Sequence, residues 1–134
     1  MQLSLSLLKL SSILITTLEK YFSEFNLTLA KFIALIVLQR EDREYLLISE
    51  IADNMGVSKK NTSRLLESLK KEKLISISPC SKDRRVKKVA LLTKGKKILN
   101  LTLPGYYELL NHFFKDVTQT QKNKIATLLM QILK

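Results

Sequence analysis

A short basic run between two apolar stretches contains the side chains of this sequence that are best suited to binding chemistry. In SPCSKDRRVKKVALLT, residues 78–93, five lysine and arginine residues surround a single acid, Asp83. Guanidinium and ammonium groups bind phosphate and carboxylate oxygens through charge-assisted hydrogen bonds. The alternation of apolar residues on both sides predicts a two-stranded ribbon, so the basic residues lie at its tip. The stretch therefore predicts a hairpin that contacts a polyanion.

The net charge of +11 is concentrated around this hairpin. Between Lys59 and Lys97 there are 14 basic and 3 acidic residues, whereas the rest of the chain has 9 of each and is neutral. A field localised in this way attracts an extended polyphosphate more effectively than a small anion. A solvated lysine-rich surface is the alternative, but the confinement of the charge to one segment favours nucleic acid.

The sequence lacks the residue sets that catalysis or metal binding would require. It has one histidine, His112, and one cysteine, Cys80. A histidine metal cluster or a Cys–His nucleophile therefore cannot form within one chain, and we expect a non-enzyme without metal or cofactor. Cys80 lies at the base of the ribbon, where basic neighbours would lower its pKa, which makes it a candidate redox residue. An incidental cysteine is the favoured alternative, because no resolving cysteine accompanies it.

Two short helices separated by a glycine precede the ribbon. Residues 49–55 are predicted to form a helix that ends at Gly56, a residue that tolerates the left-handed conformation of a helix end. Ser58 can then cap a second helix, which buries Thr62, Leu65, Leu66 and Leu69. This pattern predicts a helix-turn-helix. The second helix presents polar and basic side chains at its N-terminal end, and the candidate DNA-binding residues are Ser58, Lys59, Lys60, Asn61, Ser63 and Arg64.

Hydrophobic periodicity predicts the remaining elements. We expect helices over residues 3–25, 28–40, 94–111 and 120–134, and short strands over 45–47, 74–77 and 89–91. Pro104 predicts a bend or an interruption of the third of these helices. The apolar start of the chain is interrupted by Lys9 and is too short to span a bilayer, so we expect a cytoplasmic protein without membrane association. One cysteine is consistent with a reducing compartment.

These elements predict a mainly α fold with a small β-wing, a winged helix-turn-helix in a single domain over residues 1–134. Residues 45–97 are expected to form the DNA-binding part. Residues 1–27 and 98–134 are expected to form a dimerisation region, because the wide apolar face of the first helix needs either the rest of its own domain or another subunit to cover it.

The order of elements and the residues themselves resemble the MarR (multiple-antibiotic-resistance regulator) family of winged-helix transcription factors. IADNMGVSKKNTSRLLESLKKEKLI is similar to the helix-turn-helix of that family, and KDRRVKKVALLTKGKKIL to its wing and the start of the next helix. FNLTLAKFIALIVL matches the usual second-helix entry, so the likeness covers nearly the whole chain. Leu47 and Leu92 depart from the threonines that the family usually has, and we expect Ser49 and Thr93 to start the two helices concerned instead.

The resemblance implies a DNA-binding transcriptional regulator, a repressor, that binds a pseudo-palindromic operator in double-stranded DNA as a homodimer. It implies that the second helix enters the major groove and that Arg85 of the wing enters the minor groove, where Asp83 can orient its guanidinium. The alternative for this pair is a surface ion pair of little energetic value. The other wing residues would contact phosphates: Lys82, Arg84, Lys87 and Lys88.

Three points stay open at the level of the sequence. Members of the family often bind small phenolic ligands, so release by a small aromatic ligand is implied, but no residue set identifies one. A winged-helix protein-interaction module that binds an acidic partner is one alternative function. A constitutive architectural DNA-binding protein without ligand sensing is the other.

Overall fold

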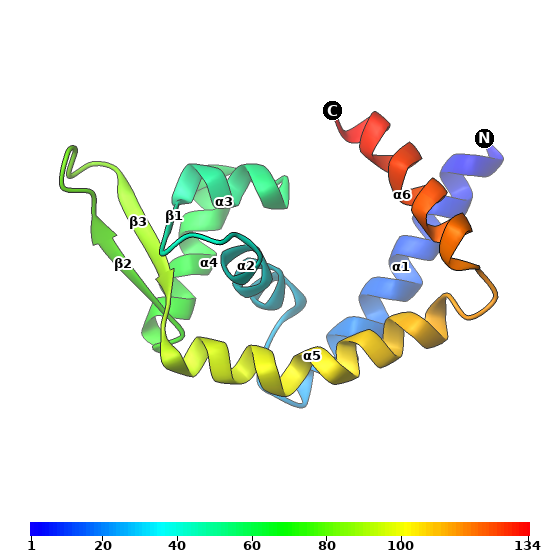
Figure 1. Ribbon diagram of the computed structural model, residues 1–134, viewed down its shortest axis with the longest axis horizontal. Helices are drawn as coiled ribbons and strands as arrows, with labels where there is room; N and C mark the ends of the chain where they lie inside the picture. Colours follow the sequence, from blue (N-terminus) through cyan, green and yellow to red (C-terminus); the bar gives the residue numbers. More distant parts are fainter.

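The computed structural model describes residues 1–134 and has six helices and one small sheet (Figure 1). The elements in chain order are α1 (Gln2–Ser23), α2 (Leu29–Arg40), β1 (Leu46–Leu47), α3 (Ile48–Met55), α4 (Lys59–Lys71), β2 (Ile75–Pro79), β3 (Lys87–Leu91), α5 (Thr93–Phe113) and α6 (Gln119–Leu133). The predicted mainly α fold with a small β-wing is confirmed.

The molecule has a lobe at one end and an arm at the other. The lobe consists of α2, α3, α4 and the sheet, and α5 runs from its base to the arm, where α6 and the N-terminal half of α1 lie (Figure 1). Helices α1 and α2 both pack against α5. The assignment of the arm to dimerisation remains a prediction.

The helix-turn-helix has the predicted turn. Gly56 ends α3 with a φ of 67°, the left-handed conformation that glycine adopts without steric cost. Ser58 precedes α4, and its Oγ accepts a hydrogen bond of 3.2 Å from the backbone N–H of Asn61. Gly56 therefore ends α3 and Ser58 starts α4 within a turn of three residues.

The predicted role of Ser49 as the cap of α3 is wrong. The helix begins at Ile48, with Leu47 in the cap position, and the side chain of Leu47 cannot accept a hydrogen bond. The carboxylate of Glu50 instead accepts a hydrogen bond of 2.9 Å from the backbone N–H of Leu47. Arg43 holds that carboxylate in turn, with NH1–Oε2 at 2.5 Å and NH2–Oε1 at 3.2 Å. Only the glutamate half of a capping box is present, and it suffices to start the helix.

The wing is built on a three-stranded antiparallel sheet in the order β1-β3-β2. In the register, Val89 of the central strand pairs with Ile77 on one side and Leu46 on the other. The loop of residues 80–86 closes through the backbone N–H of Cys80, which donates to the carbonyl of Val86 at 2.7 Å. The base of the ribbon is thereby anchored in the lobe, while its tip projects away from it (Figure 1).

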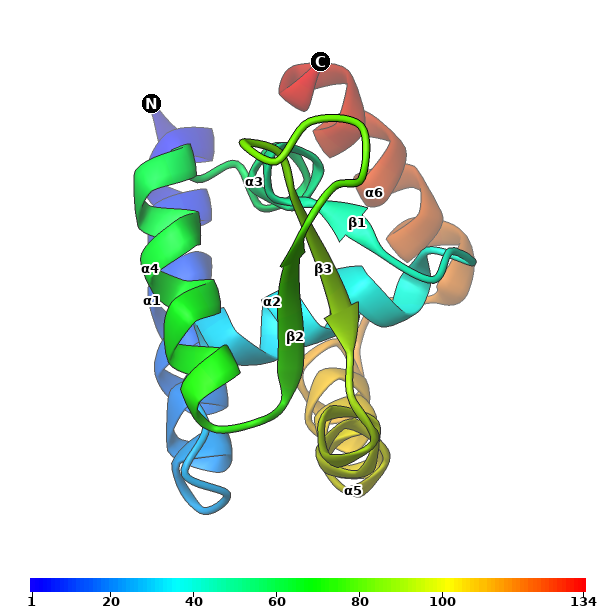
Figure 2. The same cartoon turned by 90° about the vertical axis from the view of Figure 1, so that its left-hand side faces the viewer.

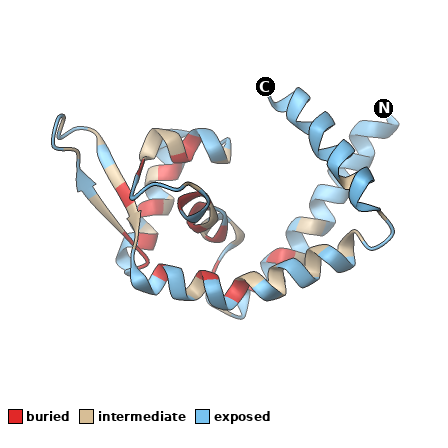
Figure 3. Ribbon diagram, in the orientation of Figure 1, coloured by how far each residue is buried: buried red, intermediate tan, exposed pale blue.

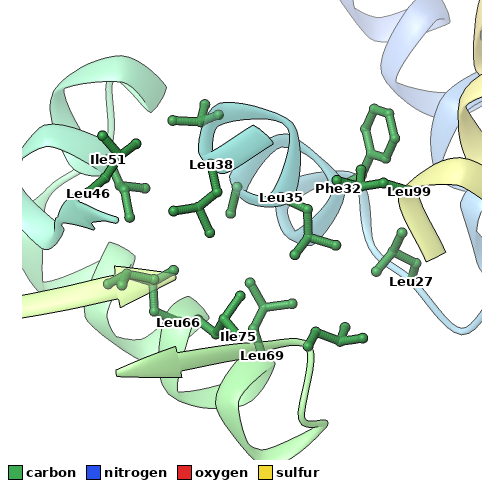
Figure 4. Close-up of a cluster of buried hydrophobic side chains, with 14 of the residues drawn as sticks. Leu27, Phe32, Leu35, Leu38, Leu46, Ile51, Leu66, Leu69, Ile75 and Leu99 are labelled. Atoms are coloured by element: carbon green, nitrogen blue, oxygen red, sulfur yellow. The ribbon is translucent and has the colours of Figure 1, made fainter. Parts of the chain in front are cut away.

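A single hydrophobic core holds α4 in place. Figure 4 shows side chains of α2, α3, α4 and β2 meeting between these elements, and α5 contributes Leu99 at one edge. The fully buried members include Phe32, Leu35, Ile51, Leu66, Leu69 and Ile75. Burial of one such side chain contributes roughly 1.5–3 kcal/mol. One face of α4 is therefore fixed inward, and its opposite face is fixed outward.

Of the two alternatives expected at Pro104, a bend or an interruption, the interruption does not occur, because α5 runs unbroken through this residue. Proline removes the hydrogen bond to the carbonyl of Asn100. Asn100 is exposed, so water can satisfy that carbonyl. The next residue, Gly105, has no Cβ, and this lets Tyr21 of α1 approach and donate its hydroxyl hydrogen to the Thr102 carbonyl at 2.8 Å. The helix thus crosses α1 closely at the point where it leaves the lobe.

Apolar side chains are exposed along the arm. No residue of α6 is buried, and the N-terminal half of α1 is exposed as well (Figure 3). Leu3 is 68 % exposed, Leu128 50 % and Ile132 69 %. None of the helices combines the length and the hydropathy that crossing a bilayer requires.

Two buried threonines allow a test of the core of the lobe. The hydroxyl of Thr102 donates to the carbonyl of Ile98 at 2.8 Å, whereas the buried hydroxyl of Thr62 in α4 has no partner. We predict that Thr62→Val leaves the free energy of unfolding unchanged or raises it by up to about 1 kcal/mol, and that the matched Thr102→Val lowers it by about 1 kcal/mol. Urea unfolding measures both. Equal destabilisation by the two substitutions would contradict the prediction.

Candidate nucleic-acid interface

The N-terminal end of α4, the start of α3 and the returning strand of the wing meet around one recess. It has a volume of about 330 Å³, and its polar lining consists of Ser49, Lys59, Ser63, Arg85 and Lys87. In Figure 2, α4 and the ribbon lie next to each other, with the wing loop and the first turn of α4 at the same end of the lobe. The structure therefore brings candidate residues of the helix and of the wing together.

The side chains of α4 divide between this recess and the open surface. Lys59 and Ser63, one turn apart, face the recess, while Lys60 and Arg64 lie on the exposed side of the helix. Asn61 is exposed as well. These last three side chains have no hydrogen-bond or carboxylate partner within the chain, so their donors and acceptors are available to a ligand.

On the wing, Asp83 holds Arg85 from two directions. The Oδ1 atom of Asp83 accepts a hydrogen bond of 3.0 Å from the backbone N–H of Arg85, which closes a tight turn. The guanidinium returns to the same carboxylate, with Nε–Oδ1 at 3.3 Å and NH2–Oδ2 at 3.5 Å. The predicted contact is confirmed. The Arg85 side chain is 92 % exposed, so the ion pair contributes little to stability.

The other basic residues of the wing point in several directions. Lys82 and Arg84 are exposed at the tip, and the Nζ of Lys87 donates to the carbonyl of Arg84 at 3.2 Å. Lys88 does not line the recess. Its ammonium lies 5.1 Å from the centre of the Tyr45 ring, a cation–π arrangement next to β1. Of the wing residues predicted to bind, Arg85 and Lys87 are the two that join the helix residues there.

Two residues of this region are absent from the site predicted from the sequence. Ser49, expected to cap a helix, lines the recess next to the first turn of α4. Tyr45, expected only as part of a strand, places its ring 6.0 Å from the guanidinium carbon of Arg43 as well as next to Lys88. The local sequence EDREYLL gives no signal for Tyr45, which is flanked by Glu44 and Leu46. No pattern in the sequence places Ser49 opposite the wing.

Cys80 lies at the start of the wing loop and is partly exposed. The pKa of its thiol is lowered, chiefly because the backbone N–H of Lys82 hydrogen-bonds the sulfur. Desolvation opposes this effect, and the N–H of Asp83 and the ammonium groups of Lys88 and Lys82 add to it. A lower pKa increases the thiolate fraction near neutral pH. Histidine, cysteine and acidic residues form no group of three that could hold a metal ion.

Comparison with known proteins agrees with this geometry. The sequence model of the MarR family matches residues 25–86. An HTH-type transcriptional regulator of Bacillus cereus is 30% identical over 112 residues, which are 84% of this chain and 73% of that protein. The transcriptional repressor MprA of Escherichia coli (strain K12) is 26% identical over 102 residues, 76% of this chain. The aligned part covers 58% of MprA, less than two thirds of its length.

Solved structures agree with the fold. The MarR family regulator Sco3205 of Streptomyces coelicolor, solved in complex with DNA, superimposes with a TM-score of 0.91 at 18% identity, over 98% of this chain and 83% of that one. At this identity the match concerns the arrangement of helices and wing. Together with the family match and the Bacillus cereus relative, the wing, the glycine turn and the basic helix place this chain in the MarR family of transcriptional regulators.

Proposed function

We propose that this chain is a DNA-binding transcriptional repressor that acts as a homodimer on a pseudo-palindromic operator. The observation that carries the proposal is the recess where Lys59 and Ser63 of α4 meet Arg85 and Lys87 of the wing. A helix and a ribbon that present cations at the same end of a lobe can contact two adjacent grooves of one duplex. The DNA complex of Sco3205 and the repressor name of MprA support this assignment.

The exposed side of α4 is proposed to read bases in the major groove. Asn61 matches the donor and acceptor edge of adenine, and Lys60 or Arg64 matches the acceptors of guanine. Ser58 and Lys59 lie at the first turn, where contacts to phosphate set the register. Because the buried stripe fixes the rotation of α4, these side chains enter the groove without further rearrangement.

The wing is proposed to insert Arg85 into the flanking minor groove. Its guanidinium is already held by Asp83, so less rotamer entropy is lost on binding. Lys82, Arg84 and Lys87 are proposed to contact phosphates. Lys88 is also proposed to contact a phosphate. To reach the DNA backbone, its ammonium group must move away from the Tyr45 ring.

The arm is proposed to form the dimer. The exposed leucine and isoleucine side chains of α1 and α6 are an apolar surface of the kind that a second copy covers in a symmetric dimer. Two copies would place their α4 helices about one helical turn of DNA apart, so half-site centres should be roughly 10 bp apart. We further propose that a small organic ligand releases the DNA.

The first test separates base-sensing from phosphate contacts. Arg85→Ala should weaken operator binding by about 1–3 kcal/mol per half-site and relax the A·T preference at flanking positions, because a narrow minor groove attracts an arginine. Lys87→Ala should weaken binding to all sequences alike and reduce the salt slope by about one per site. Selection of duplexes from a random pool, followed by affinity measurement at several salt concentrations, gives both quantities. Indistinguishable sequence profiles for the two variants would refute the assignment.

The second test isolates the role of Asp83. Asp83→Asn keeps an acceptor for the backbone N–H of Arg85 but removes the charge that holds the guanidinium. We expect tighter binding to all duplexes, because a negative charge near phosphate is lost, together with a weaker A·T preference at the flanks. The matched control Glu67→Gln makes the same charge change on the exposed side of α4 and should tighten binding without altering that preference. Identical profiles for both variants would mean that Asp83 does not orient Arg85.

The third test concerns the dimer. Leu128→Glu combined with Ile132→Glu should separate the subunits, because a carboxylate buried in an apolar interface is costly without a partner. Leu92→Glu, on a side chain of the lobe that is 38 % exposed, is the control and should leave the assembly unchanged. Sedimentation equilibrium at micromolar concentration reports the assembly state. A folded wild-type monomer that binds the full palindrome would argue against the dimer.

A further inference from the structure

Ser49 is the hydroxyl that α3 contributes to the recess at the start of the recognition helix, α4. It lies in the first turn of α3, and the same recess is lined by Lys59, Arg85 and Lys87. The side chains of Ser49 and Ser63 form no hydrogen bond within the chain, and neither lysine belongs to an ion pair. Cations and free hydroxyls from three elements therefore surround one space, an arrangement that complements an anion.

The position of this recess indicates which anion it meets. In the proposed complex α4 enters the major groove and the wing enters the flanking minor groove. One sugar–phosphate strand separates two neighbouring grooves of a duplex, so the surface between the helix and the wing faces phosphates and not base edges. Helix α3 packs against both α4 and β3, which places its first turn at this strand.

Glu50 fixes the start of α3. Its Oε1 atom accepts a hydrogen bond of 2.9 Å from the backbone N–H of Leu47, and Arg43 binds both of its oxygens, with NH1–Oε2 at 2.5 Å and NH2–Oε1 at 3.2 Å. The side chain of Leu47, in the cap position, forms no hydrogen bond with the helix. Because Ser49 directly precedes Glu50, these contacts also fix the backbone that carries the Ser49 hydroxyl.

Arg43 is in turn connected to the wing. Its guanidinium carbon lies 6.0 Å from the centre of the Tyr45 ring, and the ammonium of Lys88 on β3 lies 5.1 Å from the same centre. In the sheet, Leu47 pairs with Lys88. A row of contacts thus runs from Glu50 through Arg43 and Tyr45 to the central strand of the wing, so the first turn of α3 and the wing keep one relative position.

We propose that Ser49 donates its hydroxyl hydrogen to a DNA phosphate in the recess, and that Glu50, held by Arg43, is the positioning residue for this contact. Lys59 and Lys87 attract the same phosphate by charge, whereas Ser49 adds a directed hydrogen bond without charge. Glu50 does not touch DNA and acts through the backbone of Ser49. The inference rests on the proposed function, since the anion is the backbone of the duplex.

The positioning role predicts an effect opposite in sign to that of charge alone. Glu50→Ala removes a negative charge near DNA, which by itself tightens binding. It also removes the acceptor for the Leu47 N–H, and we expect operator binding to weaken by about three- to tenfold per half-site. Glu50→Gln removes the same charge but keeps an acceptor that serves equally well at this position, so it should bind at least as tightly as the wild type.

Asp53→Ala is the matched control for the loss of charge. Asp53 is an exposed acid of the same helix whose side chain has no partner, so its removal should not weaken binding. Urea unfolding verifies that every variant is folded under the conditions of the DNA titration. If Glu50→Ala, fully folded, binds the operator as tightly as Asp53→Ala, Glu50 has no positioning role.

The contact of Ser49 is located with modified operators. Ser49→Ala should weaken binding to every sequence by about tenfold per half-site, because a hydrogen bond to a charged group is lost. The salt slope should stay unchanged, since serine displaces no counterion, in contrast to Lys87→Ala. A neutral methylphosphonate at the phosphate between the two contacted grooves should reduce the difference between wild type and Ser49→Ala to about threefold or less. Methylphosphonates at other positions should leave that difference at about tenfold.

The double variant shows whether Glu50 acts through Ser49. In the Ser49→Ala background, Glu50→Ala should no longer weaken binding, and further weakening there would overturn the positioning role. If the wild type binds its operator and Ser49→Ala binds it with equal affinity, the phosphate contact is wrong and the proposed function stands. If the wild type binds no duplex, the proposed function fails and this inference fails with it.

Discussion

Burial of one stripe of α4 is the constraint on which the other features of this molecule depend. Leu66 and Leu69 are fully inaccessible among side chains of α2, α3 and β2, so the helix can neither rotate nor slide without exposing them. The outward direction of Lys60 and Arg64 follows from this, because they lie on the other side of the same helix. The position of the wing is fixed by the same core, because Val89 anchors its central strand there. A small lobe can thus present a rigid basic surface although none of its basic side chains is itself buried.

Folding separates the basic residues of one segment of the sequence into two groups. In the sequence, 14 basic residues between positions 59 and 97 form one continuous block. In the structure this block divides between two ends of the lobe. Lys59 of α4 and Arg85 and Lys87 of the wing line the recess, whereas Lys94 and Lys97 lie near the C-terminal end of α4, beside the loop that follows α1. The two groups lie near opposite ends of α4, so Lys94 and Lys97 are not part of the surface around the recess.

Much of the fold could be predicted because it depends on local rules. Gly56 ends one helix through its backbone conformation and Ser58 starts the next through a single hydrogen bond within a few residues, and the predictions for both are confirmed. The predictions are wrong where residues far apart in the sequence determine the local structure. Glu50 with Arg43 replaces the expected cap at Ser49, and the unbroken course of α5 at Pro104 depends on exposure of one carbonyl and on the contact with Tyr21. The sequence identifies candidate residues on the helix and on the wing, but it does not show which of them meet around one recess. The position of Lys88 next to the Tyr45 ring likewise depends on the three-dimensional packing.

Helix α5 determines how the two parts of the molecule can act on each other. Its first turns touch the C-terminal end of the recognition helix through Lys94, and its middle contacts α1 through the hydrogen bond from Tyr21 to Thr102. The helix is continuous between these points, so the lobe and the arm are joined without a break at Pro104. In the symmetric dimer proposed above, this connection would set the separation of the two recognition helices, and the spacing of half-sites on DNA tolerates little change.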